Sequence, residues 1–334
     1  MSQSAPPGSP YHRLGRTTRY RWWRPIAGTV ALAGAAVVGM CLLFGVVTVV
    51  AELTDRPSDA DGLPVFGPVP DAAILIAALA LLLPLVLATA RLVERRPAGT
   101  VSSVTGRLRW GWLGRCLLIA APLIIGMVLG ADLLLGLTTD EDSLLGPADA
   151  WVGAPEFAAG LLIVLLLVPF QAAAEEYVFR GWLVQAVGSY LRSPWPAIGL
   201  QALLFAGAHG FGTGWGVLDL VVMGALCGWL TIRTGGLEAA IGLHVANNLI
   251  AFSLAAAFGG LTADETVADA PWQLVIVDVL AISLFALIAD RLAARRHLAT
   301  VVPSTPGPLV PGDITAAPGT TAHLPDADVE SRGW

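Results

Sequence analysis

Lysine is absent from this 334-residue chain, and charged residues of any kind are scarce. All nineteen basic residues are arginine, and charged residues make up only 13% of the sequence. Soluble domains carry about 25% charged residues. A low charge content combined with 55% hydrophobic residues therefore excludes an ordinary soluble domain and predicts a polytopic membrane protein.

Cysteine is equally sparse. Cys41, Cys116 and Cys227 lie in separate apolar runs without metal-type spacing. Their odd number argues against a disulfide framework, and we interpret all three as small buried residues. The sequence also lacks a glycine-rich phosphate loop and any strand-like alternation. Because its arginines suit membrane topology and lipid headgroups, we expect a lipid bilayer and no nucleic acid among the partners.

The main feature of the sequence is a series of long apolar runs. A spanning helix needs about 20 mostly apolar residues. The fifth of the eight candidate runs is the weakest, because it is too short to span alone unless flanking residues join it. We predict an all-α transmembrane bundle of about eight spans, at residues 26–50, 72–90, 112–137, 157–187, 196–209, 215–232, 237–258 and 272–289.

The arginines alternate with these runs. Sixteen of them fall on one side of the membrane if there are eight spans, and acidic residues occupy the opposite loops. Arginine gathers in cytoplasmic loops, so we predict that both termini are cytoplasmic and that the protein is a multi-pass protein of a bacterial plasma membrane. Residues 1–20 and 298–334 are rich in Pro, Ser, Thr, Gly and Ala and lack apolar periodicity, so we expect them to be disordered.

Ionisable residues inside the apolar runs are few and expensive. On insertion scales each costs roughly 2.5–3.5 kcal/mol, so each is a functional candidate. Asp219 and Asp278 lie near the outer ends of their helices, and we interpret them as interfacial or capping residues. The full set is Glu175, Glu176, Arg180, His209, Asp219, His244 and Asp278, joined by polar Asn247 and Asn248.

The first three of these residues form one motif, Glu175-Glu176-x-x-x-Arg180. Glu176 and Arg180 are four residues apart, so they share a helix face and can pair. Glu175 is rotated by about 100° from Glu176, which leaves its carboxylate available as a general base. The alternative is a helix end at the membrane interface, where such charges are ordinary.

The histidines extend the motif to other helices. His244 and Asn248 are four apart and share a face. Two histidines and a carboxylate can ligate a metal such as zinc, and they can equally supply a base and oxyanion donors. The spacing does not separate these two possibilities, and no His-Glu-x-x-His helix is present.

Taken together, the motifs resemble those of a known family. Glu175-Glu176-x-x-x-Arg180, Phe205-x-x-x-His209 and His244-x-x-x-Asn248, in this order on successive apolar runs, resemble the CPBP family. This is the CAAX-protease and bacteriocin-processing group of intramembrane proteases, also called the Abi family. The resemblance covers about residues 155–290 and leaves the first three spans and the tails outside it.

The resemblance implies roles for the motif residues. By carry-over, Glu175 is the general base that activates water, and His209 holds that water with it. His244 and Asn248 bind the oxyanion, while Glu176 and Arg180 orient the motif helix. Both a metal-dependent and a metal-free glutamate mechanism have been argued for the family, so Glu175, His209 and His244 are also the possible ligands of a divalent metal such as zinc.

We therefore predict an intramembrane endopeptidase that acts on a membrane-embedded or lipidated peptide or protein. Two alternatives stay open: a non-catalytic immunity or scaffold protein on the same fold, and a proton-coupled transporter, for which no convincing internal repeat is found. The predicted domains are a cytoplasmic Arg-rich segment at 1–24, three spans at 25–150, a CPBP-like protease domain at 151–292 and a disordered cytoplasmic tail at 293–334.

Overall fold

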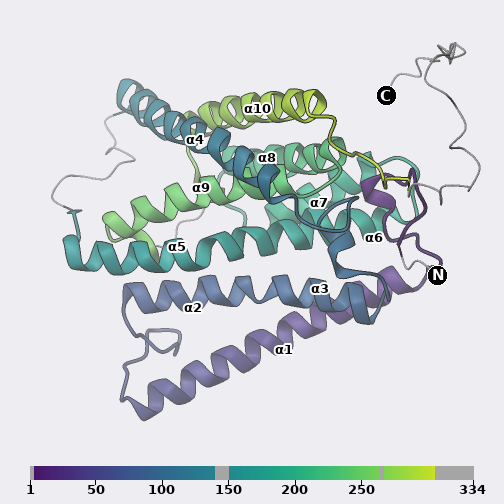
Figure 1. Ribbon diagram of the computed structural model, residues 1–334. Helices are drawn as coiled ribbons and strands as arrows, with labels where there is room; N and C mark the ends of the chain where they lie inside the picture. The colour runs from purple at the N-terminus through teal and green to yellow at the C-terminus, as the bar shows by residue number, and fades with distance from the viewer. Residues whose placement is uncertain (1–3, 140–149, 263–266, 305–334) are drawn as a thin grey trace, which may run out of the picture. The chain divides into compact units, whose positions relative to one another are not determined.

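The computed structural model describes residues 4–139, 150–262 and 267–304, and this described part of the chain is all-helical without a strand. One stretch, Tyr177–Leu183, is a π-helix that continues α5 into α6. The α-helices are α1 (Arg24–Leu53), α2 (Pro68–Ala80), α3 (Leu82–Leu92), α4 (Trp110–Thr138), α5 (Ala154–Glu176), α6 (Val184–Gly188), α7 (Trp195–Ala208), α8 (Gly214–Thr234), α9 (Glu238–Ala257) and α10 (Trp272–Arg295) (Figure 1).

Seven helical stretches of the described chain are long and apolar enough to cross a membrane, which makes the protein a multi-pass integral membrane protein. Helix α7 has only 14 residues, fewer than the roughly 20 of a spanning helix. The expected weakness of this fifth run is therefore confirmed. The long stretches are Arg24–Leu53, Pro68–Leu92, Trp110–Thr138, Ala154–Gly188, Gly214–Thr234, Glu238–Ala257 and Trp272–Arg295.

The arginine-bearing segments meet at one end of the bundle, which we call the arginine end. Arg16 donates to the carbonyl of Ser189, Arg96 donates to Gln185, and Arg109 donates to the carbonyl of Ala299. These contacts join segments that the alternation of charges places on one side. Which face of the membrane the arginine end occupies stays a prediction.

The opposite end is marked by other loops. The amide of Val152 donates to the carbonyl of Ala257, and Thr213 donates to the carbonyl of Ala270. The chain after α6 starts at the arginine end and reaches Thr213 at the opposite end, so α7 with the residues that follow it runs the length of the bundle.

A proline divides the second span. Pro84 has no N–H to donate to the carbonyl of Ala80, and its ring collides with that carbonyl in a continuous helix. Helix α2 accordingly ends at Ala80 and α3 begins at Leu82. The predicted single run of 72–90 is thus a two-part helix that covers residues 68–92.

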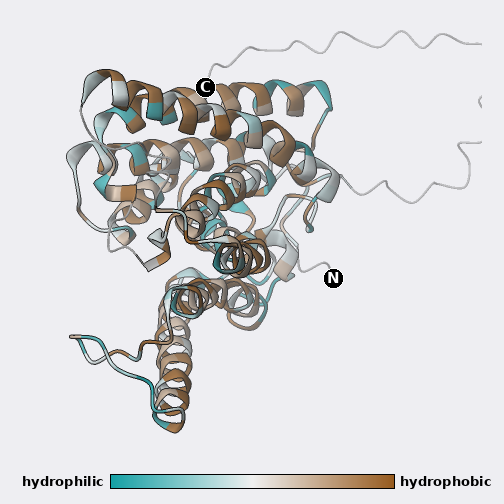
Figure 2. Ribbon diagram, turned by 90° about the vertical axis from the view of Figure 1, so that its left-hand side faces the viewer, coloured by the Kyte–Doolittle hydropathy of each residue, from teal (hydrophilic) through white to brown (hydrophobic). Residues whose placement is uncertain are grey.

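Helix α1 exposes apolar side chains along most of its length. Only 6% of its most hydrophobic window is buried, it contacts α3 and diverges from α2 (Figure 1), and Figure 2 shows it as a mostly hydrophobic helix. Such a surface suits lipid. The expectation that all cysteines are buried is wrong for Cys41, which is exposed on α1, and correct for Cys116 and Cys227.

The segment before α1 packs against the bundle, so the expected disorder is wrong for residues 4–20. Tyr11 is fully buried and donates a hydrogen bond to the carbonyl of Val101. The amide of Gly8 donates to the carbonyl of Val302, which also gives order to residues 298–304. Residues 305–334, the rest of the expected tail, lie outside the described residues.

Helices α5, α7, α8 and α9 hold the part of the bundle where the motif residues lie. Helix α9 packs against α5 and α4, and α7 packs against α8. A Cβ on Gly224 of α8 would stand 2.9 Å from the Cα of Ala202 on α7, so this glycine permits close approach of the two backbones. Gln201 of α7 donates to the carbonyl of Gly224 and secures the same contact.

Candidate active site

The motif residues of α5 point into the bundle. Gln171, Glu175 and Glu176 are all buried, and Arg180, on the π-helix that follows, is fully buried. Short π-helical stretches inside α-helices are frequent at functional sites. The alternative of ordinary charges at a membrane interface is therefore wrong for this motif.

Glu176 is the centre of a buried ion-pair cluster. Its Oε1 accepts from Arg180 Nη1 at 3.0 Å and from His244 Nδ1 at 2.7 Å. The pairing of Glu176 with Arg180 confirms the prediction from their spacing. The bond to His244 was not predicted, because it joins residues 68 apart on two helices. The Arg180 guanidinium also lies 4.1 Å from the ring centroid of Phe205.

Glu175 lies between the two histidines. Its Oε2 is 3.8 Å from His244 Nε2 and 4.0 Å from His209 Nε2. That oxygen is buried and has no hydrogen-bond partner among the described residues. Burying an acceptor without a partner costs about 1–3 kcal/mol, so a carboxylate oxygen in this position calls for an occupant between it and the two rings.

His209 directly follows α7 and lies on one side of the site. Its Nδ1 is 2.9 Å from the carbonyl oxygen of Phe205, and its ring packs on the Phe205 ring at 4.6 Å between centroids. Gly210 follows with φ of +94°, a conformation that glycine adopts without strain. The His209 side chain is 25% exposed, against 3% for His244, so the site is open on the His209 side.

Two hydrogen bonds connect Asn248 to Glu175 through Gln171, a residue that the sequence analysis did not identify. Asn248 Nδ2 donates to Gln171 Oε1 at 3.1 Å, and Gln171 Nε2 donates to Glu175 Oε1. Asn247 Nδ2 in turn lies 3.4 Å from Asn248 Oδ1. The available signal was the position of Gln171, which is four residues before Glu175 and therefore on the same helix face.

The partners of the two rings determine which nitrogen faces the site. The carbonyl oxygen of Phe205 and the Glu176 carboxylate only accept hydrogen bonds, so both Nδ1 atoms carry the proton. In neutral histidine the Nε2 atom is then an acceptor. Three acceptor atoms consequently face one another: Glu175 Oε2, His209 Nε2 and His244 Nε2.

This donor set has the chemistry of a zinc site. Zinc accepts two histidine nitrogens and a carboxylate oxygen, and each ring is held by a carboxylate or carbonyl through its other nitrogen, as metal-binding histidines are. The distances are wide, however. Two ligands of a tetrahedral zinc lie about 3.4 Å apart, and no group of three His, Cys, Asp or Glu in the described chain is close enough to form a metal site as it stands.

Asp219 and Asp278 do not take the interfacial place predicted for them. They are only 4% and 6% exposed, and their carboxyl groups lie close to each other across α8 and α10. The interpretation as interfacial or capping residues is therefore wrong. Proximity to a helix end does not reveal that two helices bring their carboxyl groups together.

Comparisons with known proteins agree with the motifs. Residues 157–250 match the family model described as type II CAAX prenyl endopeptidase Rce1-like. The chain is also 26% identical over 239 residues to the uncharacterized protein YyaK of Bacillus subtilis (strain 168), an alignment that covers 68% of this chain and 76% of YyaK. No solved structure matches.

The matched segment holds every motif residue: Glu175, Glu176, Arg180, Phe205, His209, His244 and Asn248. It runs from α5 to the middle of α9, so it includes both histidines and the carboxylate between them. The resemblance drawn from the three motifs is thus confirmed for residues 157–250, which match the Rce1-like model of the CPBP family.

Proposed function

We propose that this protein is an intramembrane endopeptidase in which Glu175 activates the attacking water. One observation carries the proposal: Glu175 Oε2 is buried without a hydrogen-bond partner in the described chain and lies 3.8 and 4.0 Å from two histidine nitrogens. A single water between Glu175 Oε2 and the two rings donates its two hydrogens to Glu175 and to one of the histidine nitrogens. The substrate is a membrane-embedded or lipidated peptide or protein.

The proton transfers follow from the acceptors at the site. Glu175 takes a proton from the water as the oxygen attacks the peptide carbonyl, and the same carboxyl group then donates that proton to the leaving amine. A low-dielectric site strengthens both the attraction to the developing charge and the effect of each fixed donor.

The oxyanion needs hydrogen-bond donors that face the substrate. The Asn248 amide has two N–H bonds, of which one is used by Gln171 and the second is directed to the oxyanion. His244 becomes a donor at Nε2 when it takes up a second proton, and the Glu176 carboxylate at its Nδ1 compensates the resulting charge. Glu176 and Arg180 thus orient His244 as well as the motif helix.

Zinc is the cofactor for which these residues have the right chemistry. Glu175, His209 and His244 would hold the ion, and it would lower the pKa of a bound water and polarise the peptide carbonyl. Because the three atoms stand wider than tetrahedral ligands do, loading requires them to move closer together.

The decisive experiment compares two near-isosteric variants of the same helix. Purified wild type, Glu175→Gln and Glu156→Gln are incubated with a prenylated CAAX peptide and with apolar membrane-spanning peptides. Glu156 lies on α5 like Glu175, but it is exposed near the start of that helix. We expect Glu175→Gln to lower the cleavage rate by about 10²–10⁴-fold and Glu156→Gln to leave it unchanged.

Cleavage that survives Glu175→Gln refutes the assignment of the base. A chelator provides the second arm on wild-type protein. Loss of cleavage that zinc restores supports the metal-dependent form of the proposal, and cleavage that resists chelation supports the metal-free form. Comparing the prenylated peptide with the same peptide lacking its prenyl group tests whether lipidation is part of recognition.

A further inference from the structure

A cavity lies between α4, α8, α9 and α10, next to the candidate active site. Its volume is about 370 Å³, within the range of 300–1,000 Å³ that is typical of small-molecule sites. Most of its wall is apolar and comes from side chains such as Met127, Met223 and Leu254. Asp219, Asp278 and Asn247 are the polar members of the lining.

The two carboxyl groups of this cavity are incompletely satisfied. Asp219 and Asp278 lie close to each other, and the Oδ1 atom of each is buried and has no hydrogen-bond partner in the described part of the chain. Each such atom costs about 1–3 kcal/mol. Two carboxyl groups in contact resist ionising together, and a pair that shares one proton holds one net negative charge.

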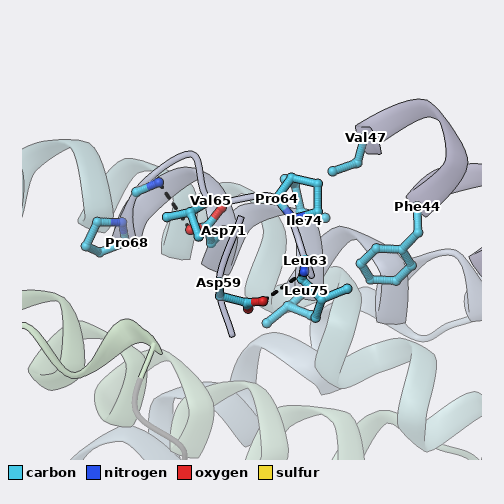
Figure 3. A pocket seen from close by; sticks show the side chains of 11 residues that line it. Phe44, Val47, Asp59, Leu63, Pro64, Val65, Pro68, Asp71, Ile74 and Leu75 are labelled. Atoms are coloured by element: carbon cyan, nitrogen blue, oxygen red, sulfur yellow. Dashed lines mark hydrogen bonds between the residues drawn. The ribbon is translucent and has the colours of Figure 1, made fainter. Parts of the chain in front are cut away.

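Another cavity shows what structural carboxylates look like in this protein. It has a volume of about 380 Å³ and is lined by residues of α1, α2 and the loop between them (Figure 3). There Asp59 accepts from the backbone amide of Leu63, and Asp71 accepts from the amide of Gly67. These carboxylates hold their own loop, whereas Asp219 and Asp278 line the cavity and each keeps a buried oxygen without a hydrogen-bond partner in the described chain.

We propose that the cavity between α4, α8, α9 and α10 binds an organic cation, namely an aliphatic chain that ends in an ammonium or guanidinium group. The cationic end donates to the carboxyl groups of Asp219 and Asp278, and the aliphatic part lies against the apolar wall. A cationic donor group satisfies both acceptors and balances the charge of the pair. A bare metal ion fits less well, because no third His, Cys, Asp or Glu joins the two in the described chain.

This chemistry has two sources, a free amphiphilic amine and a Lys or Arg side chain of a peptide. Asn247 lines the cavity and contacts Asn248, which places the cavity one residue along α9 from the catalytic set. In the peptide case the cavity is a specificity pocket, and that case rests on the proposed function. The free-amine case is independent of it.

The test is calorimetric titration of the purified full-length protein with n-hexylamine and with n-hexanol, its neutral analogue of equal length. We expect saturable binding of hexylamine at least about tenfold tighter than that of hexanol. Asp219→Asn/Asp278→Asn removes all charge from the pair and abolishes the preference. Either single variant keeps one carboxyl group and part of the preference.

Two further variants separate the site from general effects. Asp61→Asn removes an exposed carboxylate outside this cavity and is expected to bind like wild type. Ala251→Leu fills the cavity but keeps both carboxyl groups, so it loses hexylamine binding even if the double variant fails to fold. An apolar acetylated peptide with one Lys, compared with the same peptide carrying norleucine, identifies the source of the cation.

Hexylamine binding that depends on Asp219 and Asp278 supports the proposed cation site. If the peptide then binds more tightly with Lys than with norleucine, the natural ligand is a peptide side chain. If Lys gives no advantage, the natural ligand is a free amine. Equal binding of hexylamine and hexanol to wild type, or an undiminished preference in the double variant and in Ala251→Leu, overturns the proposed cation site. Because the titration has no cleavage readout, failure of this site and failure of the proposed peptidase activity give different results.

Discussion

Removing the charge of Glu176 is the perturbation that the site should tolerate least. Glu176→Gln preserves the size of the side chain and one acceptor oxygen, but it leaves Arg180 without a carboxylate. Both side chains are fully buried, and their charged atoms are 3.0 Å apart. The substitution therefore creates an uncompensated cation inside the bundle.

The magnitude follows from the surroundings of Arg180. Breaking a buried ion pair by removing one partner costs about 3–5 kcal/mol. Phe205 stays in place with its ring centroid 4.1 Å from the guanidinium, and a cation–π contact is worth about 0.5–2 kcal/mol. That remaining partner places the expected loss for Glu176→Gln near the lower limit, at about 3 kcal/mol.

A double-mutant cycle turns this reasoning into a measurement. Wild type, Glu176→Gln, Arg180→Met and the double variant are unfolded reversibly in mixed micelles, with tryptophan fluorescence as the signal. The double variant carries no unpaired charge, so we expect it to recover at least about 2 kcal/mol relative to the sum of the single losses. A Glu176→Gln protein within about 0.5 kcal/mol of wild type, the range of ordinary surface substitutions, would refute the central role of Glu176.

Three further predictions concern positions around the site and beyond it. Gln171→Leu removes the donor to one oxygen of Glu175, and we expect cleavage to fall about tenfold or more while the melting temperature changes little; unchanged cleavage would show that Gln171 does not position the base. Gly224→Ala forces α8 away from the backbone of α7 and should cost about 1–3 kcal/mol in the unfolding assay, whereas Gly126→Ala, whose Cβ would meet nothing within 4 Å, should not destabilise. Burial lowers the pKa of His12 below its usual 6.5, so the unfolded chain binds a proton that the folded chain does not, and stability should decline as pH falls below 6.5; His12→Gln should flatten that decline.

Local spacing predicted the parts of the site that lie within one helix. Glu176 and Arg180 pair because four residues bring them onto one face, and the same rule separates Glu175 from them. Residue spacing along one helix does not predict contacts between two helices. The bond from His244 to Glu176 and the contact between Asp219 and Asp278 each join two helices, and each depends on a packing register that single-sequence periodicity does not encode.

The prediction of disorder from composition was wrong where a few large side chains pack against the bundle. The segment before α1 has the polar, Pro- and Ser-containing composition of a disordered tail, yet Tyr11 and Leu14 are almost fully buried against the bundle. Two such anchors outweigh the average of a segment. Proline has a similar limit: Pro84 accompanies the break at Leu81, because it removes a helical hydrogen bond, whereas Pro122 and Pro169 lie inside α4 and α5 without dividing them.

In the proposed mechanism, the hydrogen bonds of the two rings limit when each histidine can act. With Nδ1 of His244 donating to Glu176, a neutral His244 presents only a lone pair at Nε2, so it holds water before the attack and cannot stabilise an oxyanion at that stage. It becomes a donor only while it holds the proton that the attacking water released to Glu175, 3.8 Å away, and that proton returns through Glu175 to the leaving amine. The Glu176 carboxylate compensates the charge of that protonated ring, so in the proposed mechanism the second glutamate of the motif acts in the chemistry as well as in the fold.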